Sequence, residues 1–393
     1  MVMTERAGLL RRMTARDPDE QHRASTPLEL LFDLTLVVAV SQVAAELHHA
    51  IAENHLLSAL PYFFVAFFAI WWAWMNFTWF ASAYDTDDVL YRVLTLLQMG
   101  GVLVLAGGVP AAFNGNLGVI VLGYVIMRVA MIGQWLRAAR QHPESRATTM
   151  RYAIGIVVVQ AAWVGMLFIP KPLSLIVIVI LILTELAGPV YAEAAGTGTT
   201  WHPGHIAERY GLFTIIVLGE VLLSTLLTVR EAIEGETVRG ELIAIGGGAL
   251  VIVFALWWFY FLGDEPELKD LRTAVAWGYG HYFLFGSVAA LGAGVGAAVD
   301  IVTHHGHASE LLASMTIAVS ACVFMVVLAV LHAVSGWEPT GFTPLVIAAA
   351  VVVLAAGSTA AWIGLGGSVL AIAAVLAITL GVKLFAMHRV VEA

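Results

Sequence analysis

The sequence predicts an all-α integral membrane protein. Of the 393 residues, 60% are hydrophobic and only 12% are charged, and the mean hydropathy of +0.88 exceeds what a soluble domain needs. The apolar runs are continuous, as in residues 173–184, whereas strands of a membrane barrel alternate in segments of about ten residues. A membrane-spanning helix needs about 20 mainly apolar residues, and the chain offers about twelve such runs.

The predicted spans take up most of the chain and leave little for a soluble domain. They lie near residues 28–51, 59–82, 88–109, 116–137, 150–169, 172–193, 206–228, 241–262, 272–298, 309–333, 344–363 and 367–387. Residues 1–26 carry five arginines and no apolar core. We therefore expect them to form a basic cytosolic tail, since a cleavable signal peptide needs an apolar segment.

Lysine and arginine predict the orientation of the spans, because short basic loops stay in the cytoplasm. The tail, the segment from Arg137 to Arg151 and the carboxyl end with Lys383 and Arg389 hold most of these cations. With the tail inside, all of them fall on the same side. An even number of spans then places both termini in the cytoplasm.

The sequence also contains an apparent internal duplication. The matching positions are Glu29 with Glu208, Thr35 with Thr214, and Ala69–Trp72 with Ala255–Trp258. We predict a first half over 27–200 and a second over 201–393, each with six helices and together forming one membrane domain. Six helices per half give both the same orientation, as in some secondary transporters. Chance similarity between apolar helices is the alternative.

Two carboxylates in the first span are the clearest candidates for chemistry. Glu29 and Asp33 are four residues apart, so a helix places them on one face. Such close carboxylates resist ionising together unless a cation lies between them. Arg92, at the start of the third span, is the nearest candidate by topology. The pair predicts either a proton or cation site or a structural ion pair.

The seventh span also opens on charged residues. Glu208 and Arg209 begin it and would fit at the level of the lipid headgroups. Glu220 lies twelve residues further on, roughly 18 Å along a helix. A carboxylate at that depth has to be protonated, paired or exposed to water.

Other ionisable residues lie inside spans as well. Glu185 precedes Gly188-Pro189, which predicts a kink that frees backbone carbonyls. We interpret four of these residues as a possible buried polar network: Arg128, Glu185, Glu220 and His281. Charges inside a membrane usually face a partner or a cavity, but the sequence does not say which of them meet.

Other patterns carry weaker predictions. Histidines 48, 49, 55, 304, 305 and 307 fall on the predicted outer side, where a solvated loop is a simpler explanation than a zinc site. Small residues recur through 286–298 and predict close internal helix packing or, alternatively, contact within a homo-oligomer. The single cysteine excludes an intrachain disulfide.

The sequence lacks the common catalytic motifs. It has no Walker loop, no His-Glu-x-x-His pair and no Gly-x-Ser-x-Gly elbow. We therefore assign no catalytic residue and expect no cofactor, no resident metal and no nucleic-acid partner. The partners that we expect are the lipid bilayer and an unidentified small molecule or ion.

Three motifs together resemble one known family. They are Glu29-Leu-Leu-Phe-Asp-Leu with Val-Ala-Val-Ser-Gln42, Tyr84-Asp-Thr-Asp-Asp88 with Arg92, and His205-Ile-Ala-Glu-Arg-Tyr-Gly with Gly219-Glu220. They are similar to the low temperature requirement protein A (LtrA) family. Leu31 and Val221 depart from residues common there, Phe and Ser, and neither departure removes a charge.

The resemblance implies a multi-pass protein of the bacterial inner membrane, without supplying a substrate or a reaction. The residues it marks are Glu29, Asp33, Arg92, His205, Glu208, Arg209 and Glu220. A secondary transporter or proton-coupled permease that uses buried carboxylates fits twelve spans and a duplication. The alternatives are a lipid-binding or lipid-modifying protein, and a non-catalytic membrane scaffold that supports growth in the cold.

Overall fold

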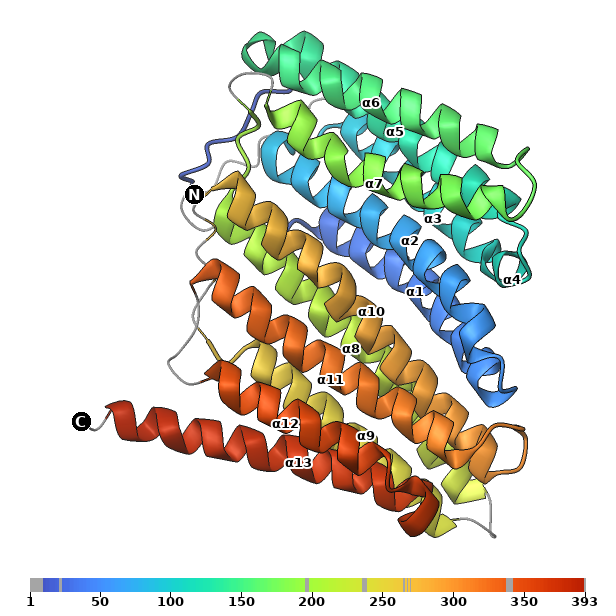
Figure 1. The fold of residues 1–393 in the computed structure, drawn as a ribbon. Helices are drawn as coiled ribbons and strands as arrows, with labels where there is room; N and C mark the ends of the chain where they lie inside the picture. Colours follow the sequence, from blue (N-terminus) through green and yellow to red (C-terminus); the bar gives the residue numbers. More distant parts are fainter. Residues whose placement is uncertain are drawn as a thin grey trace. The chain divides into compact units, whose positions relative to one another are not determined.

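The computed structural model is helical, and Figure 1 shows the order of its helices. It describes residues 10–20, 23–194, 198–234, 239–263, 266, 268, 270–336 and 342–391. The helices are α1 Pro27–Ala52, α2 Leu56–Tyr84, α3 Val89–Gly107, α4 Val109–Phe113, α5 Gly118–Gln141, η1 Pro143–Ser145, α6 Arg146–Met166, α7 Leu173–Glu193, α8 Pro203–Glu234, α9 Arg239–Tyr260, α10 Leu271–Val302, α11 Glu310–Ser335, α12 Phe342–Gly357 and α13 Ala360–Val391.

Each of the twelve predicted spans overlaps one of these helices, although the span predicted over 344–363 runs past the end of α12 into the start of α13. Within the described ranges, 11 helices are long and apolar enough to cross a membrane, and most of α12 forms a shorter apolar helix, Thr343–Gly357. The five-residue α4 is an addition that the hydropathy did not predict. The prediction of an all-α multi-pass membrane protein is confirmed.

The chain forms two compact units. The first comprises the chain up to Ala39 together with Phe68–Arg209, and the second comprises Val40–Phe67 together with Tyr210–Ala393. The helices α1, α2 and α8 therefore contribute residues to both units. The predicted halves, divided near residue 200, are a different grouping, and the duplication remains a prediction.

Glycine allows close helix packing in the first unit. A Cβ added to Gly101 of α3 would lie 2.8 Å from the Gly123 carbonyl oxygen of α5, closer than real Cβ atoms come. Further along α5, the Trp135 ring stacks on Tyr152 of α6 with centroids 4.2 Å apart. Small residues and aromatic stacking thus hold α3, α5 and α6 together.

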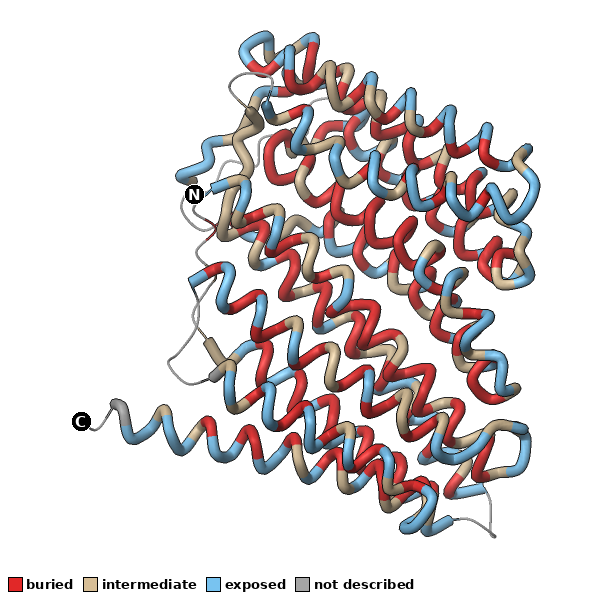
Figure 2. The backbone as a smooth tube through the Cα atoms, in the orientation of Figure 1, coloured by how far each residue is buried: buried red, intermediate tan, exposed pale blue. Residues whose placement is uncertain are grey.

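In the second unit α10 is the most central helix. In its most apolar stretch 72% of residues are buried, compared with 22% in α7 of the first unit, and Figure 2 shows the same contrast. A Cβ at Gly294 of α10 would lie 3.0 Å from Ile317 of α11, and one at Gly286 would lie 3.4 Å from Phe67 of α2. The small residues of α10 thus serve packing inside this unit.

Capping residues determine where several helices begin. The Thr26 backbone N–H donates to Glu29 Oε2 at 2.7 Å, and Thr26 Oγ1 accepts from the Glu29 N–H at 3.3 Å, which forms a capping box. The Asp88 side chain caps α3 by accepting from the Tyr91 N–H at 2.9 Å. Glu29 therefore has a local role in addition to its long-range contacts.

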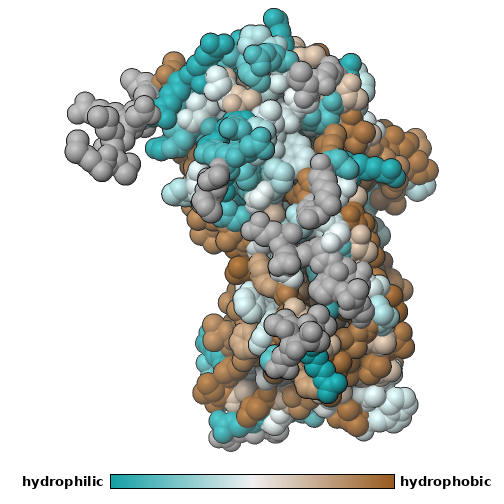
Figure 3. Space-filling view, turned by 90° about the vertical axis from the view of Figure 1, so that its left-hand side faces the viewer, coloured by the Kyte–Doolittle hydropathy of each residue, from teal (hydrophilic) through white to brown (hydrophobic). Residues whose placement is uncertain are grey.

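The surface of the helices suits a lipid environment. Many large apolar side chains on the spans are exposed, among them Leu183, Phe254 and Ile378. In the face shown in Figure 3, hydrophobic residues cover much of the flanks, and hydrophilic residues gather among the helix ends. Exposed apolar area on this scale is stable in a bilayer but not in water.

Candidate functional site

Four residues of the first unit form a buried group that we call the acid-pair cluster: Glu29 and Asp33 of α1, and His205 and Arg209 of α8. Their side chains are 0–1% exposed. The Arg209 guanidinium lies 3.2 Å from Glu29 Oε1 and also pairs with Asp33 Oδ1. His205 Nε2 lies 3.2 Å from the same Glu29 oxygen. One cation therefore serves two carboxylates.

Neighbouring residues hold the cluster in place. The indole N–H of Trp74 donates to Asp33 Oδ1 at 2.7 Å, and the Arg209 guanidinium lies over the Phe77 ring, 6.0 Å from its centroid. The four-residue spacings of Glu29 with Asp33 and of His205 with Arg209 put each pair on one helix face. The sequence spacing predicted the first of these faces correctly.

Several polar atoms in or near the cluster have no hydrogen-bond partner among the described residues. They are Asp33 Oδ2, His205 Nδ1 and the Tyr91 hydroxyl, all on residues that are at most 1% exposed. Buried polar groups are almost always hydrogen-bonded, and exceptions usually mark a site for a proton, a water or an ion. Both donors to Asp33 bind Oδ1, so Oδ2 is the oxygen open to a proton.

Arg92 does not provide the cation that we expected beside Glu29 and Asp33. It pairs with Asp87, with Nε–Oδ1 at 2.7 Å, and the two side chains are 49% and 46% exposed. Arg209 is the cation instead, and it comes from a helix 176 residues along the chain. Glu208 is exposed and separate from its neighbour Arg209, and it accepts from the Ser25 backbone N–H at 3.2 Å.

A second ion pair in the first unit joins two residues of the predicted network. Arg128 Nη2 of α5 lies 3.2 Å from Glu185 Oε2 of α7, and both side chains are at most 8% exposed. Trp72, Tyr124 and Trp163 also donate to the Glu185 carboxylate, at 2.6, 2.8 and 3.3 Å. This Arg128–Glu185 pair is balanced in charge, and its carboxylate is saturated with donors.

A cavity of about 450 Å³ lies beside that pair, between α2, α6 and α7. Its walls are mainly apolar, and Glu185, Asn76 and Arg151 are among its polar residues. Arg151 donates to the Tyr191 carbonyl oxygen at 3.1 Å and lies over the Tyr191 ring. Within the part of the chain that is described, it forms no ion pair with a carboxylate. The helix α7 continues through Pro189, which lines the cavity.

The other two residues of the predicted network lie in the second unit and have their own partners. The Ser41 hydroxyl donates to Glu220 Oε2. His281 is fully buried, with Nε2 3.0 Å from the Tyr260 hydroxyl and Nδ1 2.9 Å from the Trp277 carbonyl oxygen. The structure thus joins Arg128 to Glu185 and gives Glu220 and His281 separate contacts.

The described part of the amino-terminal segment packs against the helices of the first unit. We call residues 10–20 and 23–26 the amino-terminal strap. Its Met13 is fully buried, and the Met13 N–H donates to the Gln141 side chain at 2.7 Å. Arg16 lies 3.7 Å from Asp85, and Arg23 donates to the Ala81 carbonyl oxygen at 2.7 Å. The strap therefore crosses the ends of α2 and α5.

The pKa values of two aspartates between α2 and α3 shift in opposite directions. Burial raises the pKa of Asp85 to about 6, and the charge of Glu29 adds to this effect against the opposing charges of Arg23 and Arg16. Burial would also raise the pKa of Asp88, but hydrogen bonds from Arg137 and from backbone N–H groups outweigh it and lower that pKa to about 2. Arg137 Nη1 donates to Asp88 at 2.8 Å.

Two of the six predicted outer histidines, His48 and His307, each lie near one carboxylate. His48 Nε2 lies 2.8 Å from Asp300 Oδ2, and His307 Nε2 lies 3.9 Å from Glu53. Among the residues that the structure describes, no three His, Cys, Asp or Glu side chains gather closely enough to hold a metal ion.

Comparison with known sequences identifies the family. The family described as "Bacterial low temperature requirement A protein (LtrA)" matches residues 24–378. The uncharacterized protein RA0937 of Rhizobium meliloti (strain 1021) is 27% identical over 263 residues, which cover 65% of this chain and 62% of that protein, less than two thirds of its length. Because the family match spans most of the chain, including the acid-pair cluster, the protein belongs to the bacterial low temperature requirement A family.

Proposed function

We propose that the chain is a proton-coupled secondary transporter of the bacterial cytoplasmic membrane, and that the acid-pair cluster holds the coupling proton. The charge balance of this buried cluster carries the proposal. With His205 neutral, Glu29, Asp33 and Arg209 sum to one negative charge. An unbalanced charge inside a membrane span is costly, so one proton bound to the cluster stabilises it.

Asp33 is the residue to which we assign this proton. Its Oδ1 already accepts from Trp74 and Arg209, whereas Oδ2 has no donor among the described residues. His205 shares the cluster through its contact with Glu29. Glu220 of the second unit is a second candidate, because its carboxylate lies deep in a span beside only a hydroxyl among its described contacts.

The properties of the cavity beside Glu185 suggest which class of substrate the protein transports. Its walls are mostly apolar, Arg128 neutralises Glu185, and Arg151 contributes a cation that pairs with no carboxylate among the described residues. These features suit a small apolar organic anion, with its acid group at Arg151. A proton bound in the same unit would compensate the anion's charge during transport.

The proposed orientation places both termini in the cytoplasm. Twelve apolar helices bring the chain back to its starting side. Arg137, Arg140, Arg146 and Arg151 surround the connection between α5 and α6, and such basic connections stay in the cytoplasm.

The test uses proteoliposomes loaded with a pH-sensitive dye. Benzenesulfonate and hexanesulfonate are permanent anions, so neither crosses lipid as a neutral acid. We expect either probe, added outside, to acidify the lumen with the wild type. Asp33→Asn should abolish acidification, whereas the exposed control Asp87→Asn should retain it. Unchanged acidification in Asp33→Asn would remove Asp33 from the mechanism. If the wild type does not acidify the lumen with either probe, the result would contradict this substrate class.

A second measurement tests the bound proton without a substrate. Infrared difference spectra between neutral and alkaline pH should contain the C=O band of a protonated carboxylic acid. That band should weaken in Asp33→Asn and persist in Asp87→Asn. If the wild type lacks it at neutral pH, the cluster does not hold its proton on a carboxylate.

A further inference from the structure

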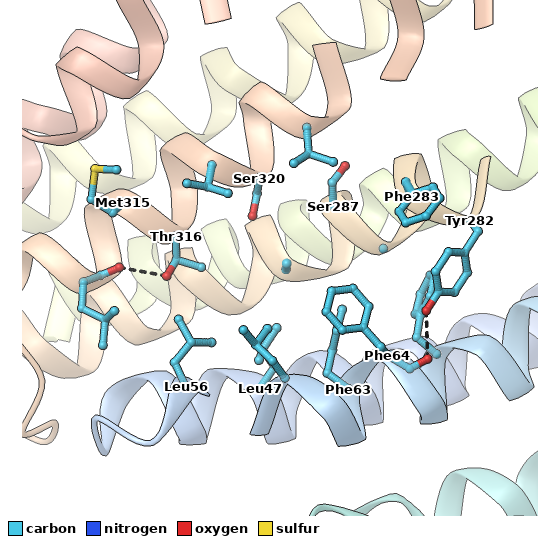
Figure 4. Close-up of a pocket in the computed structure, with 17 residues that line it drawn as sticks. Leu47, Leu56, Phe63, Phe64, Tyr282, Phe283, Ser287, Met315, Thr316 and Ser320 are labelled. Atoms are coloured by element: carbon cyan, nitrogen blue, oxygen red, sulfur yellow. Dashed lines mark hydrogen bonds between the residues drawn. The ribbon is translucent and has the colours of Figure 1, made fainter. Parts of the chain in front are cut away.

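A second cavity, of about 350 Å³, lies in the second unit (Figure 4). The end of α1, the first half of α2, α10 and α11 form its walls. Leu47 and Phe63 line one side, and Phe283 and Val319 line the other. None of the residues assigned to proton binding lines it, so its function is separate from the proposed transport.

The walls are mainly apolar, and four of the residues that line them carry a hydroxyl group: Tyr282, Ser287, Thr316 and Ser320. The Tyr282 hydroxyl donates to the Phe64 carbonyl oxygen at 2.9 Å, and the Thr316 hydroxyl donates to the Leu312 carbonyl oxygen at 2.8 Å, both drawn in Figure 4. The Ser287 hydroxyl donates to the Leu284 carbonyl oxygen at 2.7 Å. The hydroxyls of Tyr282, Thr316 and Ser287 are satisfied within the protein, so an apolar occupant leaves none of these three without a partner.

The cavity is continuous with the lipid-facing surface of the spans. Phe64, Phe283 and Val319 line it and are also 47%, 55% and 44% exposed. Because α2, α10 and α11 have the length and hydropathy of membrane spans, these side chains face hydrocarbon. Water does not stably fill so apolar a space, whereas lipid chains reach it directly.

The length of the cavity corresponds to one leaflet. It extends along α2 from Leu56, the first residue of that helix, to Phe67. Eleven residues of helix correspond to about 16 Å at 1.5 Å per residue. That is about half of the roughly 30 Å hydrocarbon thickness of a bilayer. The cavity therefore starts where α2 begins and ends near mid-membrane, as the chain of one lipid does.

We infer that this cavity binds one acyl chain of a membrane lipid. The aromatic rings of Phe63 and Phe67, 5.8 Å apart and stacked, form a smooth wall along the chain. The ring of Tyr282, 5.6 Å from Phe67, continues this wall on α10. The lipid headgroup remains at the membrane surface beyond Leu56.

Photo-crosslinking tests the inference. The protein is reconstituted in vesicles that contain phosphatidylethanolamine with a diazirine in one acyl chain, and labelled residues are located by mass spectrometry. We expect labelling at Phe64, Phe283 and Val319 to exceed several-fold that at Val330, which is exposed on α11 but lies outside the cavity. Equal labelling at all four positions would mean annular lipid only and would overturn the inference.

Filling the cavity should remove the excess labelling. Ser320→Phe places a ring inside it, and Val330→Phe is the equally bulky control on the same helix. We expect several-fold less labelling in the first variant and no change in the second. Ala290→Leu is a milder filling variant in case Ser320→Phe does not fold. If a filling variant folds and its labelling does not decrease, the cavity is not the lipid site. If filling the cavity changes the size of the oligomer, this face binds a second copy of the chain instead.

Discussion

The two buried ion clusters of the first unit differ in charge balance, although both are almost completely shielded. The Arg128–Glu185 pair has one cation, one anion and three further donors to the carboxylate. The acid-pair cluster has two carboxylates for one guanidinium and leaves Asp33 Oδ2 without a donor. Burial is therefore the same in both clusters, whereas charge balance and the hydrogen bonding of the carboxylates differ. Our proposal that the acid-pair cluster binds a proton rests on this difference.

The strongest test removes the cation from each cluster. We expect both Arg209→Met and Arg128→Met to destabilise the protein by about 3–5 kcal/mol, the usual cost of leaving a buried charge unpaired. The two effects should be similar, because a proton on Asp33 leaves one ionised carboxylate without a cation in each cluster. Thermal unfolding in detergent, followed by tryptophan fluorescence, measures both.

Neutralising the remaining acids provides the control. Glu185→Gln should restore most of the stability lost in Arg128→Met, because the three other donors still have an acceptor. Glu29→Gln with Asp33→Asn should do the same for Arg209→Met. A much larger loss in Arg209→Met than in Arg128→Met would mean that both carboxylates of the acid-pair cluster are ionised and that Asp33 holds no proton.

An intermediate effect is expected from Asp85, which lies outside the spans. Its pKa in the folded protein is about 6, above the ordinary value of 3.8. The folded state therefore binds more protons than the unfolded state between about pH 4 and 6, and the free energy of unfolding falls as pH rises through that window. Asp85→Asn should flatten this fall, as measured by unfolding temperature against pH.

Asp88 provides the matched comparison for Asp85. Its pKa in the folded protein is about 2, so its stabilisation is present above about pH 4 and is lost as pH falls toward 2. Asp88→Asn should therefore lower stability at neutral pH and leave the slope between pH 4 and 6 unchanged. The same slope in Asp85→Asn and the wild type would mean that burial does not raise the pKa of Asp85 in the folded protein.

The smallest effect is expected at the exposed pair of Arg92 and Asp87. Exposed ion pairs contribute about 0–1 kcal/mol, and both side chains are nearly half exposed. Arg92→Gln should therefore shift the unfolding temperature little and leave the infrared carboxyl band unchanged. A loss of stability comparable to that of Arg209→Met would show that Arg92 serves the acid-pair cluster after all.

The sequence predicted the helices well because hydropathy and length determine membrane insertion. Every predicted span overlaps a helix, but the predicted break between 363 and 367 falls inside α13, at Gly364 with a φ of 75°, whereas α12 ends at Gly357 and α13 begins at Ala360. It also predicted that Glu29 and Asp33 share a face. The predicted cation partner, Arg92, was wrong because helix periodicity reports only local neighbours. Arg92 is close by topology, but tertiary packing brings Arg209 next to Glu29 and Asp33 instead.

The strap shows a second limit of the sequence. Its arginines predicted a basic tail, since nothing in the pattern distinguishes a solvated arginine from one that binds backbone carbonyls. The closest local signal is Thr26-Pro-Leu-Glu29, a capping box that fixes the start of α1. The acceptors on Gln141 and Asp88 lie far along the chain and become partners only in the folded unit.

The separation of 176 residues between Asp33 and Arg209 has a consequence for biosynthesis. At about 5–20 residues per second, the ribosome makes α1 roughly 10–35 s before it makes the start of α8. During that interval Glu29 and Asp33 have no Arg209. The nascent chain must insert α1 with these carboxylates protonated, hydrated or sheltered by the insertion machinery. The acid pair is therefore neutralised first by solvent or host proteins and only later by its own cation.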